Sequence, residues 1–232
     1  MPPLHPHILR LAKDLDCSIF IESGTASGVT YRRAVESGYF DRVFSVEIVP
    51  ELAQKAAGFY SSPNYLVFEG QSHVVLKEQI LPRCSEADRI FLFLDGHYSE
   101  GATGGSDAEN PLILELQTIR KFCPSRLIIL AIDDTDDFGR IDPLVHGHNW
   151  PSRQQVETEI KQFPQDFMLL DYSGAVPHLP KIYRGLLIYT YRLPSESWLK
   201  TRIHASWPEA RSNTLLRKII LSLQSHIKLS RK

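Results

Sequence analysis

An apolar run leads straight into a loop with two glycines at Phe20-Ile21-Glu22-Ser23-Gly24-Thr25-Ala26-Ser27-Gly28. Gly24 suits a tight turn, and Gly28 lets the backbone approach a ligand where a helix begins. A simpler interpretation is that the glycines only end a strand and open a helix. However, the next apolar run ends in Glu47, whose carboxylate could accept both hydroxyls of a ribose. Together these features favour a nucleoside-type ligand.

Short apolar runs recur around this loop and alternate with amphipathic segments. Several runs are apolar throughout, as expected for strands that helices cover on both faces. The alternation predicts an α/β, doubly wound, mainly parallel sheet. No helical pattern separates the last two runs, so they should be antiparallel neighbours. The predicted strands are 18–22, 43–47, 65–68, 90–94, 127–132, 167–170 and 186–191.

Helices are expected between these strands. One should cover 27–37, and another should begin at Pro50, since proline suits a first helical turn. Asn110 followed by a proline resembles a helix start, and Leu112, Leu116 and Ile119 then repeat at helical spacing. Ser152 and Gln155 have the spacing of a capping box, for a helix that ends near residue 163.

The strand pattern stops near Pro194, which predicts a main domain over 1–194 and a basic helical extension over 195–232. The extension carries an apolar stripe at helical spacing. We expect this C-terminal helix to dock on the main domain or on a second subunit in a homodimer. Membrane-surface or nucleic-acid contact is the alternative. The stripe consists of Leu215, Leu216, Ile219, Ile220, Leu223 and Ile227.

Composition narrows the class of protein. The chain has 232 residues, 43% of them hydrophobic, which is enough for a sizeable core. A formal net charge of −1 gives no general attraction to nucleic acid or membranes. Three scattered cysteines fit neither a disulfide framework nor a zinc site. The first residues lack a signal-peptide pattern and no apolar run is long enough to span a bilayer, so a cytoplasmic location is expected.

Acidic side chains gather at the ends of two later strands. Asp95 follows the fourth strand, and Asp133 and Asp134 follow the fifth. Because ligands bind beyond the carboxyl ends of such strands, these carboxylates could converge on a hard cation such as Mg²⁺. His97 could serve as a general base, or it could only pack locally. Asp136 and Asp137, in contrast, suit solvated loop charges or helix caps.

This ordered set resembles the class I S-adenosylmethionine-dependent methyltransferases, and is nearest to the methyltransferase-24 and macrocin O-methyltransferase-like groups. The resemblance covers about 16–192 and rests on the two-glycine loop, Glu47, Asp95-Gly96-His97-Tyr98 and Asp133-Asp134. It implies a Rossmann-like sheet of seven strands, the last of them antiparallel. Two positions depart from the family pattern: Ala26 stands for the middle glycine, and Gln71 stands for an acid after the third strand.

The resemblance also implies roles for individual residues. The loop would hold the methionine part of the cofactor, Glu47 its ribose, and the residues after the third strand its adenine. Asp95, Asp133 and Asp134 would hold Mg²⁺ in the metal-dependent members, and His97 with Asp95 would form the catalytic set. The expected cofactor residues are Glu22, Ser23, Gly24, Thr25, Gly28, Glu47, Gln71, Ser72, Asp95 and Gly96.

The expected activity is methyl transfer to a hydroxyl oxygen of a small molecule or glycan, with or without Mg²⁺. The reaction needs the acceptor oxygen aligned with the methyl group and its proton removed. The alternative is a non-catalytic module of the same fold that binds a nucleoside or a partner protein. A nicotinamide dehydrogenase is disfavoured, because the spacing from Gly24 to Gly28 does not fit its glycine motif.

Overall fold

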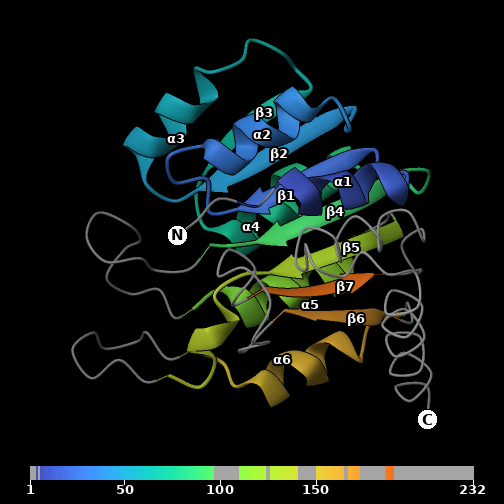
Figure 1. Cartoon of the computed structure of the whole chain (residues 1–232). Helices are drawn as coiled ribbons and strands as arrows, with labels where there is room; N and C mark the ends of the chain where they lie inside the picture. Colours follow the sequence, from blue (N-terminus) through green and yellow to red (C-terminus); the bar gives the residue numbers. More distant parts are fainter. Residues whose placement is uncertain are drawn as a thin grey trace, which may run out of the picture.

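The computed structural model describes residues 4, 6–96, 110–123, 126–140, 150–164, 167–172 and 186–190. The described part forms one twisted sheet of seven strands with helices on both faces (Figure 1). The strands are β1 (Ile19–Ser23), β2 (Arg42–Glu47), β3 (Tyr65–Glu69), β4 (Arg89–Leu94), β5 (Arg126–Ile132), β6 (Met168–Tyr172) and β7 (Leu186–Thr190).

The strand order across the sheet is β3-β2-β1-β4-β5-β7-β6. Strands β1 to β5 are mutually parallel, whereas β7 runs antiparallel to both β5 and β6. The order reverses between β1 and β4, so the carboxyl ends of these two strands form the topological switch point. The predicted α/β sheet with its antiparallel last strand is therefore confirmed.

The helices divide between the two faces of the sheet, as Figure 1 shows. One face carries α1 (Pro6–Asp14) and α2 (Val29–Ser37), and α3 (Pro50–Ala57) packs beside α2. The other face carries α4 (Ser72–Val75), which continues through a π-helical turn over Leu76–Ile80, and also α5 (Leu112–Phe122) and α6 (Arg153–Ile160). This two-sided cover explains why β4 and β5 are apolar along almost their whole length.

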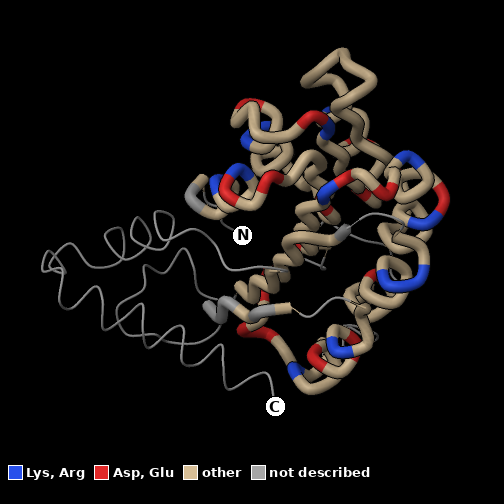
Figure 2. Tube along the Cα trace, turned by 90° about the vertical axis from the view of Figure 1, so that its right-hand side faces the viewer, with Lys and Arg blue, Asp and Glu red and all other residues tan. Residues whose placement is uncertain are grey.

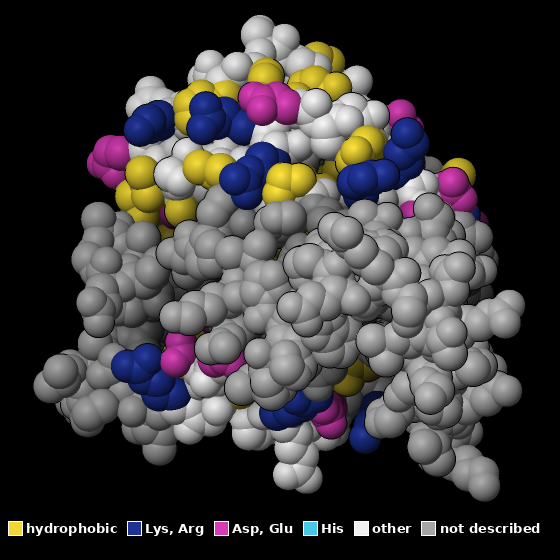
Figure 3. Space-filling view, viewed as in Figure 1, with side chains coloured by type: hydrophobic (Ala, Val, Ile, Leu, Met, Phe, Trp, Pro, Cys, Tyr) yellow, Lys and Arg dark blue, Asp and Glu magenta, His cyan; other side chains and the backbone are white. Residues whose placement is uncertain are grey.

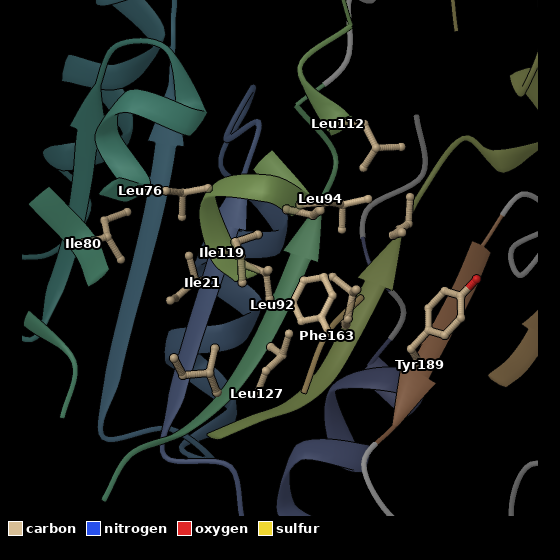
Figure 4. Packing of buried hydrophobic residues seen from close by; sticks show 14 of the residues in the cluster. Ile21, Leu76, Ile80, Leu92, Leu94, Leu112, Ile119, Leu127, Phe163 and Tyr189 are labelled. Atoms are coloured by element: carbon tan, nitrogen blue, oxygen red, sulfur yellow. The ribbon is translucent and has the colours of Figure 1, made fainter. Parts of the chain in front are cut away.

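Side chains that alternate along the strands pack into two separate cores, one on each face of the sheet. Phe20 and Phe93 belong to the core under α1 and α2, whereas Ile21 and Leu94 belong to the core under α5. Figure 4 shows the second core, with Leu112 of α5 beside Leu94 at the end of β4. The first turn of α5 therefore lies at the carboxyl end of the sheet.

Most predicted elements match within one or two residues. Helix α2 begins at Val29 rather than Ser27, because Gly28 adopts the left-handed conformation and holds the preceding loop out of the helix. The Ser152 and Gln155 capping box is confirmed, with both reciprocal hydrogen bonds present. Helix α1 was not predicted. It follows a proline-rich start and lies outside the strand–helix alternation on which the prediction depended.

Charged residues of both signs are distributed over the described part of the chain (Figure 2). Basic and acidic segments are interspersed along the trace (Figure 2), and the coloured part of Figure 3 mixes both with apolar side chains. Among the described helices, none is long and apolar enough to cross a membrane. The expected domain boundary near Pro194 and the C-terminal helix lie outside the described residues.

Candidate functional site

The glycine loop packs directly against the end of β4. Gly24 has a φ of +85°, and a Cβ atom built there would lie 2.2 Å from the backbone oxygen of Asp95. The N–H groups of Gly24 and Thr25 both donate to the carbonyl oxygen of Val46, at 2.9 and 3.1 Å. A side chain at position 24 therefore has no room, and the loop is tied to the strands on either side of β1.

The next turn of the loop is held by Glu47, at the end of β2. Its Oε2 accepts a hydrogen bond from the N–H of Ala26 at 2.7 Å, and its Oε1 accepts one from the N–H of Val49 at 2.9 Å. Ala26 itself has a φ of +46°, in the left-handed region that glycine favours. The alanine that departs from the family pattern thus keeps the backbone shape of a glycine, at a cost in strain.

Glu22 lies buried beneath this loop, on the sheet face that α1 and α2 cover. Ser45 donates a hydrogen bond to Glu22 Oε2 at 2.6 Å, and the hydroxyl groups of Ser45 and Thr25 lie 2.6 Å apart. Burial raises the pKa of Glu22 to about 8, although the Ser45 hydroxyl stabilises the charged form; the nearby charge of Glu47 raises it further. The side chain is therefore mainly a neutral carboxylic acid at pH 7.

The strand-end acids crowd one another, as the sequence predicted. Burial is the main cause of the raised pKa at Asp95, Asp133 and Asp134, reaching about 7 for Asp133 and about 6 for Asp134. The charges of Asp133, Asp134 and Glu22 raise the pKa of Asp95 further, and its Oδ1 is buried without a hydrogen-bond partner among the described residues. Burial and mutual repulsion therefore both disfavour the charged forms of these carboxyl groups.

The expected metal centre is not assembled in the described part of the chain. No three histidine, cysteine, aspartate or glutamate side chains within it are grouped so that they could hold a metal ion. Asp134 opens a short 3₁₀ turn with a φ of +53°. The three aspartates as placed therefore do not fit Mg²⁺, which needs convergent oxygen ligands.

Another buried acid, Glu115, was missed by the sequence analysis. It lies in the first turn of α5 with no exposed surface, and burial raises its pKa. A Cβ built on Gly96 would lie 3.3 Å from Glu115 Oε1 and 3.1 Å from Ser23 Oγ. The signal was present in the sequence, because position 115 falls on the same helical stripe as Leu112, Leu116 and Ile119.

The two residues expected near an adenine lie at the start of α4. Gln71 precedes the helix and is exposed, and its carbonyl oxygen accepts the N–H of Val75 at 2.9 Å. Ser72 is half-buried and close enough to Glu115 for its hydroxyl to lower the pKa of that carboxyl. The loop that connects β3 to α4 therefore lies at the same edge of the sheet as Gly24 and Gly96. The N–H of Gly70 in this loop donates a hydrogen bond to the carbonyl oxygen of Glu47 at 2.9 Å.

The structure thus gathers Glu22, Ser23, Gly24, Thr25, Gly28, Glu47, Ser72, Asp95 and Gly96 around the carboxyl ends of β1, β2 and β4. Gly28 packs at the helix start, where a Cβ would lie 2.6 Å from the Phe59 ring. The proposed base, His97, lies outside the described residues.

No family model matches the chain, and no curated protein matches it in sequence. Solved structures do resemble it. An O-methyltransferase from Bacillus cereus, in complex with SAH, has a TM-score of 0.52 and 18% identity over 82% of each chain. The O-methyltransferase TomG from Streptomyces achromogenes, in complex with SAM, has a TM-score of 0.50 and 15% identity over 80% of this chain and 78% of its own.

The methyltransferase domain of bacterial CtHen1-C has a TM-score of 0.50 and 11% identity, and the match covers 79% of this chain and 94% of that domain. At such low identity, these similarities establish the fold. The chain has the Rossmann-like fold found in these methyltransferases, and the resemblance noted from its motifs agrees with it.

Proposed function

We propose that the chain is an S-adenosylmethionine-dependent methyltransferase that methylates a hydroxyl oxygen of a small molecule or sugar. The observation that carries the proposal is the loop over 24–28, which lies at the switch point of the sheet between the buried acids Glu22 and Glu47. Ligands of doubly wound sheets bind at such a point. The proposal also draws on neighbouring O-methyltransferases with SAM or SAH bound.

The parts of the site suit different parts of this cofactor. Gly24 and Gly28 let the loop backbone pack closely against Asp95 and Phe59, since a side chain at either position would clash, and this backbone is our candidate to border the methionine part. Each oxygen of Glu47 already accepts one backbone N–H but retains a second lone pair, so the carboxylate can also accept ribose hydroxyls. The cofactor supplies an activated methyl group on a positively charged sulfur.

The chemistry left to the chain is alignment and proton removal. Asp95 follows β4 beside Gly24, close to the loop that would hold the methionine part. His97, two residues further on, is our candidate for the base that takes the acceptor proton. No step of this proposal passes through a metal ion, because the three strand-end aspartates do not fit one.

The test is titration calorimetry with S-adenosylmethionine, followed by a methyl-transfer assay over a broad set of hydroxyl acceptors. Saturable cofactor binding and a methylated product are the expected results. Binding without any product would favour the non-catalytic module, and a chain that binds no cofactor would contradict the proposal. Assays in chelator, with and without added Mg²⁺, and with His97→Ala, separate a histidine base from a cation requirement.

A further inference from the structure

Glu115 is a polar residue on an otherwise apolar helix face. It shares the buried stripe of α5 with Leu112, Leu116 and Ile119, all at most 1% exposed. Neither carboxyl oxygen is accessible to solvent, and within the described part of the chain neither reaches full hydrogen-bond geometry with another group. A leucine at this position would bury apolar surface without the cost of desolvating a carboxyl group. Packing alone therefore does not account for the residue.

The surroundings of Glu115 come from three separate segments. The hydroxyl groups of Ser23, at the end of β1, and of Ser72, at the start of α4, both favour its charged form against the effect of burial. The Ser23 Oγ atom is itself buried, with no hydrogen-bond partner among the described residues. The carboxyl group thus lies close to both hydroxyls.

Gly96 connects this cluster to the glycine loop. A Cβ at position 96 would lie 3.1 Å from Ser23 Oγ and 3.3 Å from Glu115 Oε1, so the Gly96 backbone closes directly over the pair. On its other side, a Cβ at Gly24 would lie 2.9 Å from the Gly96 Cα atom. Gly96 therefore lies close to both the cluster and Gly24, with little room for a side chain at either glycine.

We propose that Glu115 is a positioning residue for the cofactor: it holds the Ser23 and Ser72 hydroxyls, and so fixes Gly96 beneath the methionine part of S-adenosylmethionine. This inference rests on the proposed function. The carboxyl group acts from behind the backbone and does not contact the reacting atoms. It links the two loops that would border the methionine and adenine parts of one ligand.

The experiment compares Glu115→Gln and Glu115→Leu, which both fill the space of the side chain. We expect Glu115→Leu to bind S-adenosylmethionine about tenfold more weakly, whereas Glu115→Gln, which can still hydrogen-bond both hydroxyls, should stay within about threefold of the unsubstituted chain. Calorimetry gives the affinities. Ile119→Val, a change on the same buried stripe one turn away from the cluster, is the matched control and should bind normally.

Thermal melting separates positioning from stability. Glu115→Leu should melt at or above the temperature of the unsubstituted chain, because the cost of burying a carboxyl group is removed. Ser23→Ala should weaken binding as Glu115→Leu does, and the double variant should lose little more, since both changes act through one cluster.

Unchanged affinity in Glu115→Leu, equal loss in the glutamine variant, or fully additive losses would each overturn the inference while the proposed function stands. If the unsubstituted chain binds no S-adenosylmethionine, the proposed function fails and the inference fails with it.

Discussion

Glu47 Oε2 accepts a hydrogen bond at 2.7 Å from the N–H of Ala26, a residue whose φ of +46° places it in left-handed backbone. The end of β2 thereby holds the strained turn of the glycine loop. In the family that the sequence resembles, a glycine stands at this position. The hydrogen bond offsets part of the strain that the alanine introduces, and the two residues should act as one unit in experiments.

Ala26→Gly should therefore stabilise the chain. Glycine adopts this conformation without steric cost, and the gain exceeds its greater freedom in the unfolded chain, leaving about 0.5–1 kcal/mol. Ala26→Val should destabilise by more than that, because a β-branched residue rarely adopts positive φ. Urea unfolding of both variants measures the effect. A valine variant as stable as the glycine variant would show that the turn differs from the one described.

Glu47→Ala should weaken S-adenosylmethionine binding by about 2 kcal/mol, roughly thirtyfold, because hydrogen bonds to a charged group are lost. It should also lower the melting temperature, since the N–H groups of Ala26 and Val49 lose their acceptor. Calorimetry on the folded variant measures the first effect, and thermal melting measures the second. Normal affinity in a folded Glu47→Ala chain would remove the residue from the ribose site.

Gly24→Ala should abolish cofactor binding and destabilise the chain by more than strain alone. Its Cβ would lie 2.2 Å from the Asp95 oxygen, a backbone atom that cannot move aside cheaply. Gly38→Ala is the matched control, because Gly38 has a φ of +64° but open space around its Cβ position. Comparison of unfolding free energies and affinities isolates the clash. Equal effects from both substitutions would show that the close approach at Asp95 is unimportant.

The sequence was most informative about elements with a repeating pattern. The alternation of strands with helices predicted the parallel sheet, and the lack of a crossover helix before the last strand predicted that this strand is antiparallel. Both follow from how parallel strands must be connected. The tight turn at Gly24 and the close backbone approach at Gly28 were also predictable, because few residues other than glycine fit a turn against a neighbouring strand.

The remaining features depend on which side chains the tertiary structure buries, and the sequence alone does not show this. Glu115 was overlooked because a single acid in an apolar helical stripe resembles ordinary variation in helix sequences. Only its packing near Ser23 and Gly96 in the folded chain connects it to the site. The positions of Asp95, Asp133 and Asp134 at strand ends were predictable, but convergence of their oxygens depends on local backbone turns, such as the left-handed Asp134. The basic extension and His97 lie beyond what the structure describes.

The buried carboxyl groups make the stability of the folded chain depend on pH. Burial raises the pKa of Glu22 from 4.5 to about 8. Below pH 4.5, the folded and unfolded chains both keep this proton, so the group's favourable contribution to folding is fully present. Between pH 4.5 and 8, the unfolded chain loses the proton and the folded chain keeps it, so stability falls as pH rises, by about 1.4 kcal/mol per pH unit.

Asp133 and Asp134, with pKa values raised from 3.8 to about 7 and about 6, act in the same direction over a lower range. Glu22→Gln removes one titrating group, so its unfolding free energy should fall less steeply between pH 5 and 8, by about 1.4 kcal/mol per unit. Urea unfolding at several pH values measures the slope. Glu69→Gln, an exposed carboxyl at the end of β3, is the control and should keep the original slope. If Glu22→Gln keeps it too, Glu22 is not the buried neutral acid described here.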